Sequence, residues 1–231
     1  MRKLVLFDID GTLVLTGGAG LRAMNRALEE AFGHANGLDG IPVAGRTDWA
    51  ILADAVRRVG RTLDGTLLDD LQRRYVTHLA EEIHQPGHGR KGVMPGIREI
   101  LEELDRRADV VAGLLTGNFE EGARVKLGYF DLWRYFRFGA FGGDAADRNA
   151  LVPFAVERAR VCGLPEIGDS DVLVVGDTPH DVLCAHAAGA IAVAVATGSS
   201  SVEELHATGA EHVFRDLSNT HAFLELLGSE R

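Results

Sequence analysis

The stretch Phe7-Asp8-Ile9-Asp10-Gly11-Thr12 decides the fold predicted for this chain. It closes an apolar run, Leu4 to Phe7, which is typical of a strand buried on both faces. The two-residue alternation of a strand places Asp8 and Asp10 on the same side. Two like charges at the end of a buried strand are costly unless a cation lies between them. The pattern therefore indicates a hard cation such as Mg²⁺, and a carboxylate there can also act as a nucleophile towards phosphorus.

Three further apolar segments also end in polar, glycine-containing turns. They are Val110 to Leu115 before Thr116-Gly117-Asn118, Phe138 to Phe141 before Asp147-Arg148, and Val172 to Val175 before Gly176 to Asp181. In open α/β sheets, ligands bind beyond the carboxyl ends of the strands. We therefore expect these acid, hydroxyl, amide and cationic groups to meet at one edge of a sheet.

The sequence resembles the haloacid dehalogenase superfamily, in its phosphoglycolate-phosphatase-like branch. The resemblance rests on the DxDGT motif that begins at Asp8 and on the GDTPxD motif that ends at Asp181, and it covers essentially the whole chain. It implies an α/β fold: a Rossmann-like, doubly wound parallel sheet core with an inserted α-helical cap. The family's third motif is normally a lysine, whereas the best-placed cation here is Arg148.

Composition narrows the class of function. With 231 residues, 46% of them hydrophobic and 25% charged, the chain suits a globular protein with a substantial core. A net charge of −10 argues against nucleic-acid binding. No signal peptide is visible, and the longest apolar stretch, Ala190 to Ala196, is too short to span a bilayer. We predict a cytoplasmic protein, monomeric or homodimeric, with no nucleic-acid or membrane partner.

The chain divides into two compositional regimes. From about Ala108 onwards, apolar β-like runs alternate with helical patterns, which is typical of a parallel sheet. Between them and the first strand lie three helical stretches, Leu21 to Phe32, Asp48 to Val59 and Asp64 to Ile83, with no convincing strand. The breaker-rich stretch Gln85 to Gly92 indicates a linker. We predict a catalytic core over residues 1–16 and 92–231 and a helical cap over 17–91.

The resemblance assigns the catalytic roles to the first motif. Asp8 is the nucleophile and Asp10 the general acid/base, and both are expected among the Mg²⁺ ligands, Asp10 through its backbone carbonyl. The alternatives are a purely metal-binding or turn-capping role for Asp8 and an Asx turn for Asp10. Gly11 lets the chain turn beside the phosphoryl group.

The other motifs supply the metal and phosphate groups. Asp177 and Asp181 are expected to hold the metal, directly or through its waters, although Asp177 or Thr178 could instead cap the helix that opens with Pro179. The phosphate ligands implied by the resemblance are the Thr116 hydroxyl, the Gly117 and Asn118 amides, and Arg148. The alternative cation is Lys126, which we expect on the solvent face of a helix from Glu120 to Leu127.

One cap residue is a candidate for substrate binding. Arg46 follows a glycine at the start of a predicted helix and could present a cation to a carboxylate or second phosphate of the substrate. The alternative is a solvated helix start capped by Thr47.

Together these features predict a Mg²⁺-dependent phosphatase that hydrolyses a small phosphorylated metabolite, phosphoglycolate-like or a sugar phosphate, through an aspartyl phosphate. The alternatives are a β-phosphoglucomutase-type phosphomutase and a catalytically silent binding module. A phosphonatase would need a cap lysine able to form a Schiff base, and Lys91 lies only at the cap's end.

Overall fold

A six-stranded parallel sheet forms the centre of the computed structural model, which describes residues 3–163, 167–168 and 171–228. The predicted core range also includes residues 1–2, 164–166, 169–170 and 229–231, which lie outside the described residues. In spatial order the strands are β5 (Gly139–Ala140), β4 (Val110–Leu115), β1 (Lys3–Phe7), β6 (Val172–Gly176), β7 (Ile191–Val195) and β8 (His212–Phe214). The α/β doubly wound fold predicted from the sequence is confirmed.

The strand order reverses direction at β1. After β1 the chain builds β4 and β5 on one side, and then returns to build β6, β7 and β8 on the other. A crevice opens beyond the carboxyl end of a sheet at such a reversal point. The residues that follow β1, beginning with Asp8, therefore enter the crevice directly.

Helices cover both faces of the sheet because alternate residues of each buried strand face opposite sides. Val5 and Phe7 of β1 belong to one apolar cluster, and Leu4 and Leu6 belong to the other. The first face is covered by α4 (Ile97–Arg106), α5 (Glu120–Tyr129) and α9 (Thr220–Glu225), and the second by α6 (Leu151–Val161), α7 (Pro179–Ala187) and α8 (Val202–Ala207).

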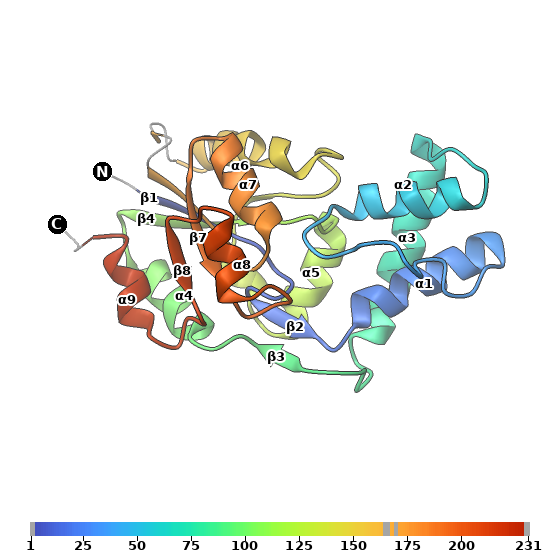
Figure 1. Ribbon diagram of the computed structural model, residues 1–231, viewed down its shortest axis with the longest axis horizontal. Coiled ribbons are helices and arrows are strands. Elements are labelled where there is room, and N and C mark those ends of the chain that lie inside the picture. Colours follow the sequence, from blue (N-terminus) through green and yellow to red (C-terminus); the bar gives the residue numbers. More distant parts are fainter. Residues whose placement is uncertain (1–2, 164–166, 169–170, 229–231) are drawn as a thin grey trace.

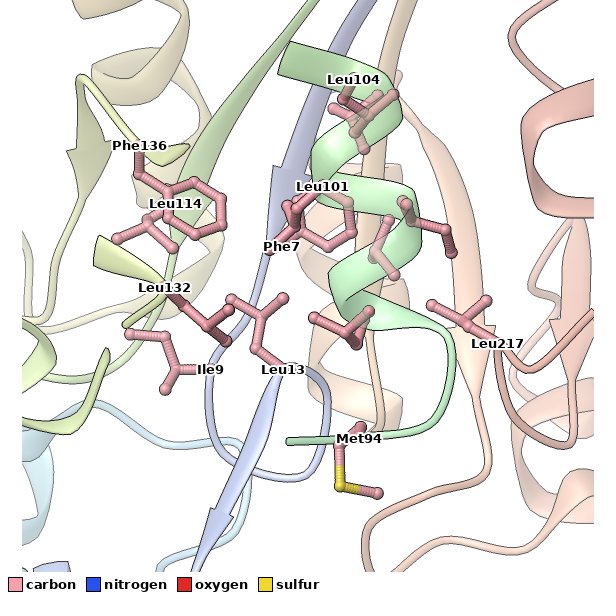
Figure 2. Close-up of a cluster of buried hydrophobic side chains, with 14 of the residues drawn as sticks. Phe7, Ile9, Leu13, Met94, Leu101, Leu104, Leu114, Leu132, Phe136 and Leu217 are labelled. Atoms are coloured by element: carbon pink, nitrogen blue, oxygen red, sulfur yellow. The ribbon is translucent and has the colours of Figure 1, made fainter. Parts of the chain in front are cut away.

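The first cluster fixes the strand that leads to the site. Figure 2 shows Phe7 beside the helix α4, whose Leu101 side chain packs close to it. The Phe7 ring centroid lies 6.2 Å from those of both Phe136 and Phe223. This packing makes the end of β1 a rigid support for the polar residues that follow it.

Three helices form a separate layer at one end of the molecule, on the right in Figure 1. They are α1 (Ala19–Phe32), α2 (Asp48–Arg58) and α3 (Gly65–Glu82), and they share an apolar cluster that includes Leu52, Leu71 and Tyr75. The side chains of Thr47 and Asp64 cap α2 and α3. We propose that these helices are the cap predicted for residues 17–91.

A short hairpin joins the two parts. Strands β2 (Val14–Thr16) and β3 (Lys91–Val93) pair antiparallel where the chain leaves and re-enters the core. The prediction of a linker up to Gly92 was wrong at this point, because three-residue strands are too short to give a two-residue period. No described helix has the length and the apolar character that a membrane span requires.

Candidate active site

A cavity of about 570 Å³ lies between the carboxyl edge of the sheet and the helical layer. Most of the predicted site residues line it: Asp8, Asp10, Gly11, Arg46, Gly117, Asn118, Arg148 and Asp177. Thr116 and Asp181 are buried beside this lining, at 0% and 2% exposure. The fold thus brings together residues that are up to 173 positions apart in the sequence (Asp8 and Asp181).

Asp8 is a buried carboxylate held by an arginine. Its backbone N–H donates to the Val175 carbonyl over 2.9 Å, which extends the pairing of β1 with β6 by one residue. Its Oδ1 lies 3.0 Å from an Arg148 nitrogen. Burial raises the pKa of Asp8 to about 6, although the Arg148 charge acts in the opposite direction.

Asp10 has a different environment. Its side chain is 44% exposed, and its Oδ2 lies 2.5 Å from Lys126 Nζ and 2.9 Å from Asn118 Nδ2. Strand β1 ends at Phe7, so a turn rather than strand alternation brings Asp10 to the same cavity as Asp8. Gly11 makes that turn at a φ of +86°, and a Cβ there would lie 2.5 Å from Asp177 Oδ2, so only glycine fits.

Lys126 contradicts the sequence prediction. It was expected on the solvent face of its helix, but it is 4% exposed and donates to Asp10 Oδ2 and, over 2.6 Å, to Asn118 Oδ1. The signal that could have found it is helical spacing. Lys126 lies four positions after Gly122 and three after Ala123, both on the buried face of α5.

Three buried carboxylates form an acidic cluster. One oxygen from each of Asp8, Asp177 and Asp181 lies within 4.8 Å of the others. Burial, and then the neighbouring charges of Asp181 and Asp8, raise the pKa of Asp177 to about 8. A set of converging carboxylate oxygens is the donor chemistry that suits a hard divalent cation.

The cluster is built from the start of α7. Asp181 Oδ2 accepts from the Thr178 N–H over 3.0 Å and from the Thr178 hydroxyl over 2.8 Å, which forms a capping box. Its other oxygen accepts from Arg148. The Thr12 hydroxyl, which the sequence analysis did not single out, donates to Asp177 Oδ1 over 3.1 Å. The capping alternative therefore holds for Thr178, and it is compatible with a metal site.

Arg148 joins the nucleophile candidate to the cluster. It lies in a short 3₁₀ turn before α6, is 7% exposed, and pairs with both Asp8 and Asp181. Burial alone would lower the pKa of its guanidinium, but the two carboxylates raise it above the ordinary value. Its charge is therefore permanent in this site.

The loop after β4 places polar groups next to Asp10. Asn118 Nδ2 donates both to Asp10 and, over 2.8 Å, to Thr116 Oγ1. Because the Thr116 hydroxyl oxygen accepts the hydrogen bond from Asn118, its own proton remains available to an anion.

The start of α2 rests on this loop. The Asp48 N–H donates to the Gly117 carbonyl over 2.7 Å, and Asp48 Oδ2 accepts from the Phe119 N–H over 2.9 Å. Thr47 Oγ1 reaches the Ala146 carbonyl at 2.9 Å. Burial raises the pKa of Asp48 to about 6. These contacts hold the helical layer against the core, and no sequence pattern indicated Asp48.

Arg46 borders the cavity, but its guanidinium is engaged within the helical layer. It pairs with Asp54 over 2.7 Å and donates to the Ala50 carbonyl over 3.3 Å. Thr47 caps α2 through the Ala50 N–H, as the alternative interpretation required. A substrate contact by Arg46 stays a prediction.

Comparison with known proteins identifies the family. Residues 5–195 match the model of the haloacid dehalogenase-like hydrolases. The chain belongs to this family. This haloacid dehalogenase-like hydrolase is 31% identical over 202 residues to phosphoglycolate phosphatase 1 of Pseudomonas aeruginosa, and 29% identical over 199 residues to a phosphoglycolate phosphatase of Pseudomonas fluorescens. Each match covers 85% of this chain and 70% of the relative, and together they support a phosphatase.

Solved structures confirm the fold of this hydrolase. CbbY from Rhodobacter sphaeroides superposes with a TM-score of 0.72 at 17% identity, covering 94% of this chain and 96% of CbbY. The family resemblance and the α/β fold predicted from the sequence are therefore both confirmed.

Proposed function

We propose that this hydrolase is a Mg²⁺-dependent phosphatase that acts on a small phosphorylated metabolite through an aspartyl phosphate on Asp8. One observation carries the proposal. Two aspartates two residues apart border the same cavity in different environments, Asp8 buried against Arg148 and Asp10 half-exposed on Lys126. Paired carboxylates in contrasting environments are suited to separate chemical roles.

Asp8 takes the role of nucleophile. Its pKa of about 6 leaves the carboxylate largely ionised at neutral pH. An Asp8 oxygen forms a bond to phosphorus while the ester P–O bond breaks, which leaves the phosphoryl group on Asp8 and releases the alcohol oxygen. The Arg148 charge, 3.0 Å from the same carboxylate, compensates the negative charge that collects there.

Asp10 takes the role of proton carrier. Its exposed carboxyl group gives a proton to the departing alcohol oxygen in the first step. In the second step it takes a proton from the water that attacks phosphorus. The bond between phosphorus and the Asp8 oxygen breaks, which releases inorganic phosphate and restores the Asp8 carboxylate. The contacts from Lys126 and Asn118 orient the carboxylate for both transfers.

The phosphoryl oxygens would be held by the loop after β4. Its candidates are the free hydroxyl proton of Thr116 and the amides of Gly117 and Asn118, with Gly117 and Asn118 bordering the cavity. Arg148 supplies a planar, bidentate donor in place of the family's usual lysine.

The acidic cluster fits a divalent cation. Asp8, Asp177 and Asp181 would hold Mg²⁺, together with the main-chain carbonyl of Asp10. When bound, the ion neutralises charge on the phosphoryl group and makes phosphorus more electrophilic. Burial and neighbouring carboxylates raise the pKa values of Asp8 and Asp177, and a divalent cation among these groups would favour their ionised forms.

The relatives named phosphoglycolate phosphatases make phosphoglycolate and sugar phosphates the first metabolites to consider. We propose a cytoplasmic reaction by a monomer or homodimer. Lys91, at the end of the predicted cap range, donates to the Ile83 and Gln85 carbonyls and lies over the Tyr129 ring, which gives no support to a phosphonatase.

Phosphate release from an aryl phosphate tests the proposal, with Mg²⁺ and with a chelator. Asp8→Asn removes the nucleophile but keeps the size of the side chain, and should lower kcat by ~10³-fold or more. Asp69→Asn, at an exposed aspartate of α3, is the matched control and should match the wild type. Turnover that persisted in Asp8→Asn, or in the chelator, would contradict the mechanism.

The phosphomutase alternative gives a different result in the same assay. A mutase would convert a sugar monophosphate to its isomer and release little inorganic phosphate, since it must protect its phosphoenzyme from water. Measuring both products for the wild-type enzyme separates the two reactions.

A further inference from the structure

The half of the cavity that faces the helical layer is mainly apolar. Beside the polar Thr16, Arg46, Asp48 and Tyr75, it is lined by six apolar side chains: Leu15, Leu21, Met24, Leu38, Val43 and Ile51. Five of them belong to the helical layer, and Leu15 belongs to the hairpin strand β2. An alcohol group attached to a phosphate held beside Asp8 would therefore meet hydrocarbon on the opposite wall.

Two of these residues are exposed although they are large and apolar. Leu21 is 48% exposed and Val43 is 39% exposed. Exposed apolar side chains scattered singly need no explanation, but two that border one cavity add apolar surface that a ligand can cover.

The cations that border the cavity are mostly paired by the protein itself. Arg148 pairs with Asp8 and Asp181, and Lys126 pairs with Asp10. Arg46, on the helical side, is bound by Asp54. His88 and Arg90 also border the cavity, from exposed positions beside β3, where water screens the charge of Arg90.

The negative charge of a second anionic group on the substrate would find no unpaired, buried cation among the described residues along this wall. A carboxylate or second phosphate placed against the apolar wall would lose its hydration without gaining a paired cation, and this is costly. An apolar group in the same place would instead release water from both surfaces, a gain of about 0.8 kcal/mol for each buried CH₂, or roughly fourfold in binding.

The volume agrees with a larger alcohol than glycolate. At about 570 Å³ the cavity falls within the range of sites that enclose ligands of drug-like size, ~300–1,000 Å³. A two-carbon acid ester would leave most of the apolar wall uncovered.

We infer that the substrate is a phosphate monoester of an uncharged, mainly apolar alcohol, and that Leu21 and Val43 contribute to its selection over phosphoglycolate. This inference rests on the proposed function, because it takes the phosphoryl group to lie beside Asp8.

The test compares two monoesters of nearly the same shape. Isobutyl phosphate has the branched skeleton of phosphoglycolate, with two methyl groups in place of the carboxylate oxygens. Its kcat/KM should exceed that of phosphoglycolate at least ~10-fold. Along the n-alkyl phosphates from propyl to hexyl, where leaving-group chemistry is constant, kcat/KM should rise up to about fourfold per CH₂.

Two variants locate the effect. Leu21→Ser and Val43→Ser should each lower kcat/KM for hexyl phosphate roughly 3- to 10-fold and leave methyl phosphate nearly unchanged. Leu183→Ser is the matched control, because Leu183 is 49% exposed on α7 and does not border the cavity. It should leave the whole series unchanged.

Binding separates this inference from the proposed reaction. Calorimetry with non-hydrolysable phosphonates should give tighter binding for hexylphosphonate and 3-methylbutylphosphonate than for 3-phosphonopropanoate. Absence of turnover with every ester would defeat the proposed function, while the phosphonate ranking would still decide the chemistry of the pocket. A flat alkyl series, or a preference for phosphoglycolate and phosphonopropanoate, would overturn the inference.

Discussion

The two walls of the cavity differ in how they use charge. On the sheet side, five ionisable side chains form two sets of direct contacts: Asp8 and Asp181 pair with Arg148, and Asp10 pairs with Lys126. On the helical side, Arg46 is bound by its own layer, His88 and Arg90 are exposed, and apolar side chains such as Leu21 and Val43 make up much of the wall. This difference agrees with our proposal that the sheet side carries out the reaction and the helical side selects the substrate. Removing charges on each side tests that division.

Arg148→Met should have the largest effect. Loss of the guanidinium leaves Asp8 and Asp181 buried without their common partner, so kcat/KM for an aryl phosphate should fall roughly 10²- to 10³-fold. Steady-state kinetics measures this, and Arg148→Lys should recover part of the loss. Arg158→Met, which removes an arginine paired with Asp144 elsewhere on the core, is the control. Equal losses in the two methionine variants would mean that Arg148 acts only through stability.

Metal binding should stabilise the protein more at pH 8 than at pH 6. Asp8 and Asp177 have folded-state pKa values of about 6 and 8, above their ordinary value of 3.8, so the folded metal-free chain binds protons that the unfolded chain has lost. Its stability therefore falls as pH rises from about 4 to 8. A cation that replaces those protons offsets this loss most where the carboxylates are ionised.

Thermal unfolding with and without Mg²⁺ measures this difference. At 100 times the dissociation constant, the gain at pH 8 should be about 2.7 kcal/mol, or roughly 5–10 °C in Tm. Asp177→Asn should remove most of the gain. Equal stabilisation at both pH values, or in the variant, would place the ion elsewhere.

Lys126→Met should lower kcat about tenfold by leaving Asp10 without its nearest orienting contact. The loss should be larger for an alkyl phosphate than for an aryl phosphate, because the poorer leaving group depends more on its proton. Kinetics on both substrates makes the comparison. A loss of the same size for both would assign Lys126 to packing rather than to the orientation of Asp10.

Arg46→Gln should have the smallest effect, less than ~3-fold on kcat/KM for any monoester. Its guanidinium is already occupied by Asp54 and the Ala50 carbonyl, so the substitution removes a contact within the helical layer. The measurement should include phosphoglycolate. A selective loss of more than ~10-fold for that substrate would restore Arg46 as a substrate cation and erase the difference between the two walls.

The sequence predicted the sheet side well because its signals are local. Apolar strands that end just before Asp8, Thr116 and Asp177 predict both the fold and the sheet edge where these polar residues meet. Contacts between distant segments were not predictable in this way. Nothing near Asp48 in the sequence indicates that its carboxylate accepts from the Phe119 amide, and Lys126 was misplaced because a charged residue in a helix was taken to face water.

The cap side was predicted only in outline. Helical periodicity predicted the three helices, but where a charged side chain is directed depends on its partner. Arg46, just before α2, pairs with Asp54 of that helix. The hairpin that joins the two parts was missed because its strands pair across the whole insertion.

That hairpin also defines how the helical layer is attached. Thr16 and Lys91 are partners in the register of β2 and β3, so the chain leaves the core and returns to it at adjacent points. In topological terms, residues 17–90 are the loop of a β-hairpin that contains its own folded body. The entropy of closing a loop grows only with the logarithm of its length, so such an insertion can vary in size or sequence at little cost to the core. The wall that we propose selects the substrate can therefore change without disturbing the wall that we propose carries out the reaction.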